Sequence, residues 1–72
     1  MNYDYSELRG KIYARYRSQT RFARELGVST GTLSLRLDSI QPFTVPEIEK
    51  SVELLQIPRE QILDYFFKHK SN

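Results

Sequence analysis

The sequence lacks the covalent and metal links that many small proteins use to stay folded. It contains no cysteine, and its one histidine, His69, stands near the end of the chain. Without thiols neither a disulfide nor a thiolate zinc site can form, and one imidazole does not make a metal site. We therefore expect no metal and no cofactor. A chain of 72 residues must then rely on regular helix packing or on a partner.

Long apolar runs, linkers and catalytic motifs are also missing. No window approaches the ~18 consecutive apolar residues of a membrane span, and residues 1–4 do not resemble a signal peptide. No Gly/Ser-rich or Pro-rich stretch divides the chain, which predicts one domain over residues 1–72 with a frayed tail over 68–72. Without a membrane span or a signal peptide, we expect a cytoplasmic protein. No Ser/His/Asp set and no glycine-rich phosphate loop is present, so we expect a protein that is not an enzyme and binds no small-molecule ligand.

Charge is distributed unevenly along the chain, although the formal net charge is only +2. Residues 1–36 hold seven basic and three acidic side chains, a net +4, whereas residues 37–67 hold two basic and six acidic ones, a net −4. The basic half could meet either phosphates or an acidic protein.

Apolar residues recur at spacings of three and four, which predicts an all-α fold of four to five short helices. Asp4 and Glu7 form the pattern of a capping box, so we expect the first helix to begin at Asp4. Its buried stripe is Tyr5, Leu8, Ile12 and Tyr16. Ser18 or Thr20 should cap a second helix that turns Phe22, Ala23 and Leu26 inward. Gly27 should end that helix in the left-handed conformation.

The second half of the chain shows similar helix-start signals. Ser29 is the predicted cap of a helix over residues 30–38, and Thr44 with Glu47 forms a second capping box. The helix after Thr44 should bury four aliphatic residues: Val45, Ile48, Val52 and Leu55. Pro58 should open a short helix over residues 59–64 that buries Ile62 and Leu63. We expect residues 65–67 to fold their aromatic rings onto the core, although they could instead anchor a dimer.

Residues 19–37 have the spacing of a helix-turn-helix. Ala23 is small enough for a close helix crossing, Gly27 supplies the turn, and Leu33 points inward from the second helix of the pair. This pattern resembles the lambda-repressor/Cro class of helix-turn-helix proteins over most of residues 5–67. The resemblance implies a compact lambda-repressor-like domain.

Four further segments are similar to a narrower group, at residues 4–10, 33–37, 41–44 and 62–67. They resemble small Cro-like lytic-switch proteins of temperate phages of Gram-positive bacteria, of the lactococcal modulator-of-repression type. This resemblance implies a protein of the bacterial host cytoplasm that opposes a phage CI repressor at the decision between lysogeny and lysis.

The outward side of the helix over residues 30–38 is poorly equipped to read DNA. Opposite the inward side centred on Leu33 and Leu37 we expect Leu35, and no side chain there can make the bidentate contacts that Arg, Lys, Asn and Gln make to base edges. Asp38 would repel phosphate. Arg36 stands where these motifs usually place a buried aliphatic residue, which leaves the rotation of the helix open.

Two functions therefore compete. The favoured one is an anti-repressor that masks the DNA-binding face of a CI-type repressor, with Arg21, Arg24 and Arg36 facing acidic groups. The alternative is a Cro-like repressor that binds operator DNA as a dimer. Both place the site on the same residues: Gln19, Thr20, Arg21, Arg24, Ser29, Thr30, Gly31, Thr32, Ser34, Leu35, Arg36 and Asp38.

Tyr13 lies off the buried stripe, next to two arginines in sequence, Arg15 and Arg17. An exposed tyrosine among cations could stack on single-stranded bases. Packing at the edge of the core is the commoner role of a helical aromatic residue, and we favour it here.

Overall fold

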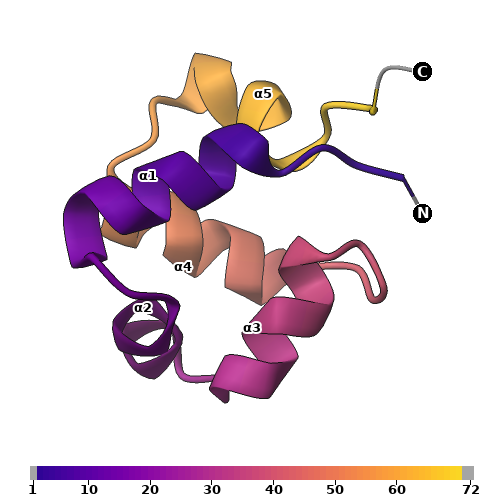
Figure 1. The fold of residues 1–72 in the computed structure, drawn as a ribbon. Helices are drawn as coiled ribbons and strands as arrows, with labels where there is room; N and C mark the ends of the chain where they lie inside the picture. Colours follow the sequence, from indigo (N-terminus) through magenta and orange to yellow (C-terminus); the bar gives the residue numbers. More distant parts are fainter. Residues whose placement is uncertain (1, 71–72) are drawn as a thin grey trace.

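The computed structural model describes residues 2–70, and these form five α-helices and one short 3₁₀ helix (Figure 1). The all-α prediction is confirmed, and within residues 2–70 β-pairing is limited to a single isolated bridge between Tyr3 and His69. The elements in chain order are α1 (Ser6–Tyr16), α2 (Gln19–Leu26), α3 (Thr30–Leu37), α4 (Val45–Leu55), η1 (Arg59–Gln61) and α5 (Ile62–Phe66).

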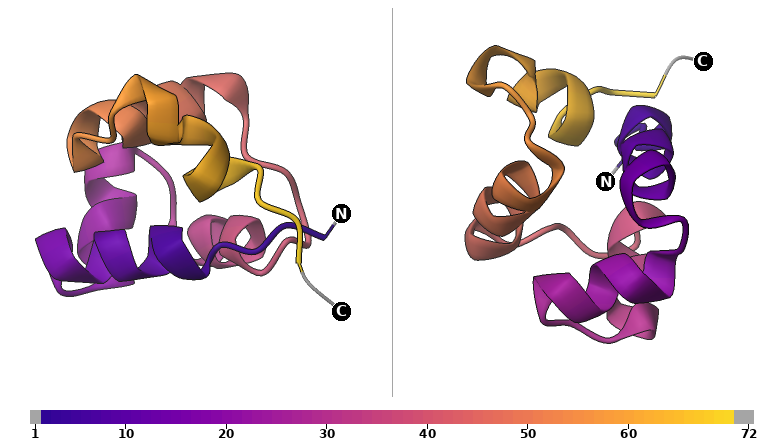
Figure 2. Two further views of the ribbon diagram at one scale, coloured as in Figure 1. Left: turned by 90° about the horizontal axis from the view of Figure 1, so that it is seen from above. Right: turned by 90° about the vertical axis from the view of Figure 1, so that its left-hand side faces the viewer.

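The helices pack so that α2 and α3 occupy one end of the molecule and α5 the other (Figure 1). α4 lies between these ends, and both chain ends meet on the side where the α3–α4 loop runs (Figures 1 and 2). The α2–α3 pair is therefore left with a broad face open to solvent.

Side-chain caps fix most of the helix starts as predicted. Ser18, Ser29 and Thr44 each accept a hydrogen bond from the backbone N–H three residues on. Thr44 also completes a capping box, because its own N–H donates to Glu47 at 2.9 Å. Each cap satisfies N–H groups that the first helical turn leaves without a partner.

The predicted capping box at Asp4 is wrong. The N-cap of α1 is Tyr5, which makes no side-chain cap, and Asp4 lies one residue too early to fill that position. Its Oδ1 instead accepts from the Ser6 N–H at 2.9 Å, which holds the pKa of Asp4 below its usual range. Glu7 does not reach back to the cap, because its Oε1 accepts from Lys68 Nζ at 3.2 Å.

Every α-helix contributes buried side chains to the core. Tyr5, Leu8 and Ile12 of the predicted α1 stripe are buried, whereas Tyr16 is only partly so. The Phe43 ring packs edge-on against the rings of Tyr5 and Phe66. The remaining buried apolar residues are Phe22, Ala23, Leu26, Leu33, Leu37, Leu55 and Ile57.

Three predicted core residues are exposed: Val45, Leu63 and Phe67, the last at 41%. Val45 is 68% exposed because it is the first residue of α4 and points off its end. Leu63 is 69% exposed because the five-residue α5 has room to bury one side only, and Phe66 takes that place at 1% exposure. Ile62 is partly buried against the core, as expected.

The predicted fraying of the tail is wrong for residues 68–70. Asp4 N–H donates to the Lys68 carbonyl at 2.7 Å, and Lys70 N–H donates to the Asn2 carbonyl at 3.0 Å. The two chain ends thus hold each other in place, and Phe67 packs edge-on against Tyr3. Residues 71 and 72 of the predicted tail lie outside the described residues.

Candidate functional site

A three-residue turn joins α2 to α3. Gly27 adopts φ +89°, the left-handed conformation in which glycine avoids the steric cost of a side chain. The N–H groups of Gly27 and Val28 both donate to the Ala23 carbonyl, at 2.9 and 3.0 Å. Ser29 follows at once and caps α3, so no free linker separates the helices. The face formed by α2 and α3 is therefore presented as a fixed unit.

α3 buries the side that the sequence predicts. Leu33 and Leu37 point into the core, and Gly31 and Asp38 are exposed. Leu35 is half-buried rather than the fully exposed tip that was expected. The chain leaving α3 folds back past it, and its carbonyl accepts hydrogen bonds from the N–H groups of Ile40 and Gln41 at 3.0 and 3.1 Å.

Arg36, the cation of α3, is held inside the molecule. Its Nε donates to Glu47 Oε1 at 2.9 Å, Nη2 to Oε2 at 3.2 Å and Nη1 to Gln41 Oε1 at 2.6 Å. The Arg36 hydrogen bond keeps the pKa of Glu47 below its usual range, against the opposing effect of burial. The Arg36 guanidinium, which was predicted to face a partner, thus pairs with Glu47 of α4. Arg36 stands where a buried aliphatic residue is usual, and its charge at this position is balanced by that carboxylate.

Asp38, the anion at the end of α3, is also paired. Arg9 of α1 donates from Nη2 to Asp38 Oδ1 at 2.6 Å and from Nη1 to Gln19 Oε1 at 3.3 Å. Gln19 in turn donates to Ser34 Oγ at 3.4 Å. Arg9 therefore ties α1 to α2 and α3 at the edge of the face. No local pattern predicts this role of Arg9, because 29 residues separate it from Asp38.

Most of the other predicted site residues are either hydroxyl side chains that bond to one another or arginines without an ion pair within the described residues. Thr30 donates to Thr20 at 3.4 Å, and Ser29 to Thr32 at 2.9 Å. Arg21 and Arg24 are exposed on α2 and make no ion pair within the described residues. Gln19 and Thr20 of α2 thus contact Ser34 and Thr30 of α3, whereas Arg36 is turned toward α4.

The face has the chemistry of a contact surface. Between residues 2 and 70, no three His, Asp or Glu side chains gather as metal ligands would. In the same part of the chain, no helix is long and apolar enough to cross a membrane. The α2–α3 face presents hydroxyl groups, a glycine, a half-buried leucine and two arginines.

Comparison with known proteins places this all-α chain in a family. Residues 1–69 match the model of the family described as "Protein of unknown function (DUF739)", and the chain belongs to it. It is also similar to the solution structure of the modulator of repression (MOR) of the temperate bacteriophage TP901-1 from Lactococcus lactis. The identity is 39%, with 100% of this chain and 97% of that chain covered and a TM-score of 0.80. No curated protein matches the chain.

The match confirms the predicted similarity to a phage modulator of repression. It does not test membership of the wider lambda-repressor/Cro class, which stays a prediction.

Proposed function

We propose that this protein controls repression in a temperate phage as an anti-repressor. It binds a CI-type repressor through the α2–α3 face, a helix-turn-helix of the lambda-repressor/Cro type, and blocks the repressor's hold on DNA. It acts in the cytoplasm of the bacterial host, as one domain, by binding and not by catalysis. The similarity to a protein whose name is modulator of repression supports a role in phage repression control.

One observation carries the choice of a protein partner over DNA. α3 contains one charged side chain, Arg36, and Asp38 caps its C-terminal end. Arg36 forms a largely buried ion pair with Glu47, and Asp38 forms an exposed one with Arg9. Apart from that exposed pair, α3 presents hydroxyl groups, Gly31 and the half-buried Leu35 at the surface, and no unpaired charge within the described residues. A DNA-reading helix needs bidentate donors to bases and cations toward phosphates, and this one supplies neither. Docking on another protein needs no such groups.

Arg21 and Arg24 are compatible with the alternative function, because unpaired arginines on α2 can bind phosphates as well as carboxylates. The alternative is a Cro-like repressor that binds an operator as a dimer. The two functions differ in what the protein does alone, so a mobility-shift experiment separates them.

The experiment uses operator DNA from the phage's switch region with this protein, with its repressor and with both. The anti-repressor leaves operator unshifted on its own and releases the repressor stoichiometrically. Tight, sequence-specific retardation by this protein alone, with the steep salt dependence of phosphate contacts, would overturn the proposal in favour of the Cro-like function.

Two variants locate the contact. Leu35→Asp puts an unpaired charge on the face and should weaken repressor binding about tenfold or more. Its matched control is Leu63→Asp, which changes an exposed leucine on α5 at the far end of the molecule. Circular dichroism verifies that both variants fold.

Gly31→Arg is the second variant. Gly31 is exposed, and a Cβ there meets nothing closer than Ser29 Oγ at 3.9 Å, so the substitution should not disturb the fold. A protein-docking face is blocked by the new side chain, whereas a DNA-binding face gains a cation and binds operator more tightly. Unchanged repressor binding by both variants would place the interface elsewhere.

A further inference from the structure

A groove runs beside the α2–α3 face, between the last turns of α1 and the start of α2. It has a volume of about 380 Å³ and is lined by Arg9, Ile12, Tyr13, Arg17, Ser18 and Gln19. Ile12 is buried and forms an apolar floor, while Tyr13 stands at the rim with 62% of its surface exposed. The favoured prediction that Tyr13 packs at the edge of the core therefore does not describe this ring.

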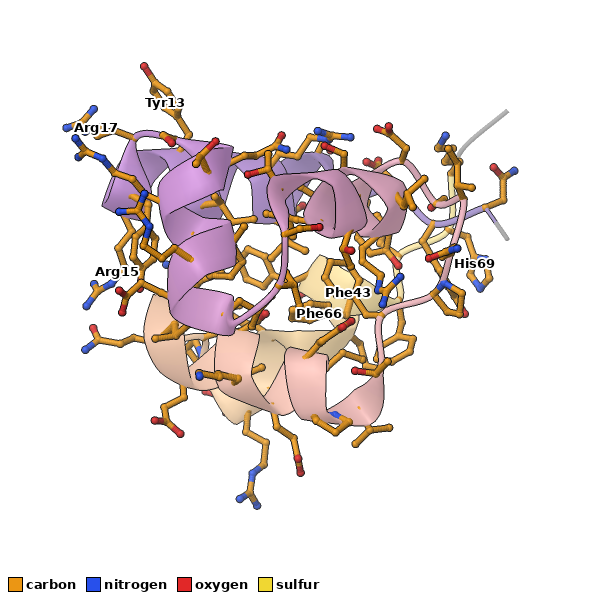
Figure 3. All side chains as sticks on the ribbon, turned by 90° about the horizontal axis from the view of Figure 1, so that it is seen from below. Tyr13, Arg15, Arg17, Phe43, Phe66 and His69 are labelled. Atoms are coloured by element: carbon orange, nitrogen blue, oxygen red, sulfur yellow. The ribbon has the colours of Figure 1, made fainter. Side chains whose placement is uncertain are left out.

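The lining of the groove contains two arginines and no acidic side chain, although Asp38 lies against Arg9. Residues 8–24 contain six basic side chains and no acidic one. Of the two arginines in the lining, Arg9 already holds Asp38, but Arg17 makes no ion pair within the described residues. The backbone of Arg17 is fixed as the C-cap of α1, at φ 64° and with its N–H donating to the Tyr13 carbonyl at 2.9 Å, and its side chain is exposed. Tyr13 and Arg17 project from the same corner of the molecule (Figure 3).

The groove is continuous with the proposed interface. Gln19 lines it and donates to Ser34 of α3 at 3.4 Å, so one side chain belongs to both the groove and the proposed interface. Exposed tyrosine and arginine side chains are the types that contribute most to protein–protein affinity. An apolar floor with an aromatic rim is of little use to a phosphate, which needs only donors and charge.

We propose that this groove is a second anchor point for the repressor protein and receives an acidic side chain carried next to an apolar one. The carboxylate pairs with Arg17, and the apolar neighbour packs on Tyr13 above Ile12. This inference rests on the proposed function, since it names the chemistry of the same partner. It adds a selecting charge beside Arg21 and Arg24 of α2, namely Arg17 at the C-cap of α1.

The test measures repressor affinity by calorimetry for the wild type, Arg17→Glu and Tyr13→Ala. Each variant should weaken binding about tenfold or more. Arg15→Glu is the matched control, because it makes the same charge change two residues away. Arg15 lines a separate hollow with Lys11, Leu55 and Gln56. The control should bind within about twofold of the wild type, and both groove side chains are exposed enough for the variants to fold.

The acidic partner is found by reversing single Asp and Glu residues of the repressor to Arg. One such reversal should restore the affinity of Arg17→Glu while weakening that of the wild type. If Leu35→Asp abolishes binding but Arg17→Glu and Tyr13→Ala match the control, the groove proposal fails and the proposed function survives. If the wild type does not bind repressor, both fail. If Arg17→Glu weakens binding to a DNA duplex and leaves repressor binding unchanged, the groove serves phosphate and the proposal is overturned.

Discussion

Arg36 of α3 and Glu47 of α4 form an ion pair in which the side chains are only 14% and 13% exposed. Glu47 also closes the capping box of α4 by accepting from the Thr44 N–H. One carboxylate thus starts α4 and fixes the C-terminal turn of α3 against it. The position of the proposed interface depends on this contact.

Glu47→Gln separates the two roles of this side chain. Glutamine completes a capping box as well as glutamate does, but it leaves the partly buried guanidinium without a counter-charge. We expect a loss of about 1–2 kcal/mol in the free energy of unfolding, measured by urea denaturation. Glu49→Gln, on the exposed side of the same helix, should change stability by less than about 0.5 kcal/mol. Equal effects of the two substitutions would show that the ion pair contributes nothing.

The same pair predicts a pH dependence. Arg36 and the Thr44 N–H lower the pKa of Glu47 in the folded protein, so folding favours its charged form. The resulting stability is present above the usual glutamate pKa of about 4.3 and is lost as the pH falls through the lowered value. The difference in unfolding free energy between wild type and Glu47→Gln should therefore shrink on acidification from pH 7 to pH 3. A difference that is constant with pH would contradict this assignment.

Ser51 predicts a stabilising substitution. It is fully buried in α4, and its Oγ has no hydrogen-bond partner within the described residues. Burying an unpaired hydroxyl costs free energy, and alanine removes the hydroxyl with little change of volume. Ser51→Ala should leave stability unchanged or raise it by up to about 1 kcal/mol, seen as a higher Tm. A clear drop in Tm would mean that the hydroxyl donates to a backbone carbonyl.

Two glycines form a matched pair. Gly27 has φ +89°, and no atom lies within 4 Å of a Cβ built there, so Gly27→Ala costs backbone strain alone, about 1–2 kcal/mol. Gly10 lies inside α1 with equally open space but without a positive φ, so Gly10→Ala should stabilise the helix by about 0.5–1 kcal/mol. Chemical denaturation measures both changes. The same sign at both positions would contradict the assigned turn.

The site residues show where sequence reasoning ends. The placement of Gly31 and Ser34 on one helix that Ser29 caps follows from the sequence pattern, and so do the buried Leu33 and Leu37. Whether each charged side chain is free or paired does not follow from the sequence pattern. Arg36 and Asp38 looked like a free cation and a free anion, but each finds its partner on another helix, 11 and 29 residues away along the chain.

The sequence alone determined α2, α3 and α4 with their three side-chain caps, and the α2–α3 turn. These depend on hydrogen bonds and apolar contacts between residues three or four apart, which the order of residues fixes directly. Only the tertiary structure decided which charges are neutralised, which aromatic ring is exposed and how the chain ends pair. Those outcomes require segments distant in sequence to meet, as Arg9 meets Asp38 and Asn2 meets Lys70. The path of the whole chain, and not any local pattern, brings these partners within reach.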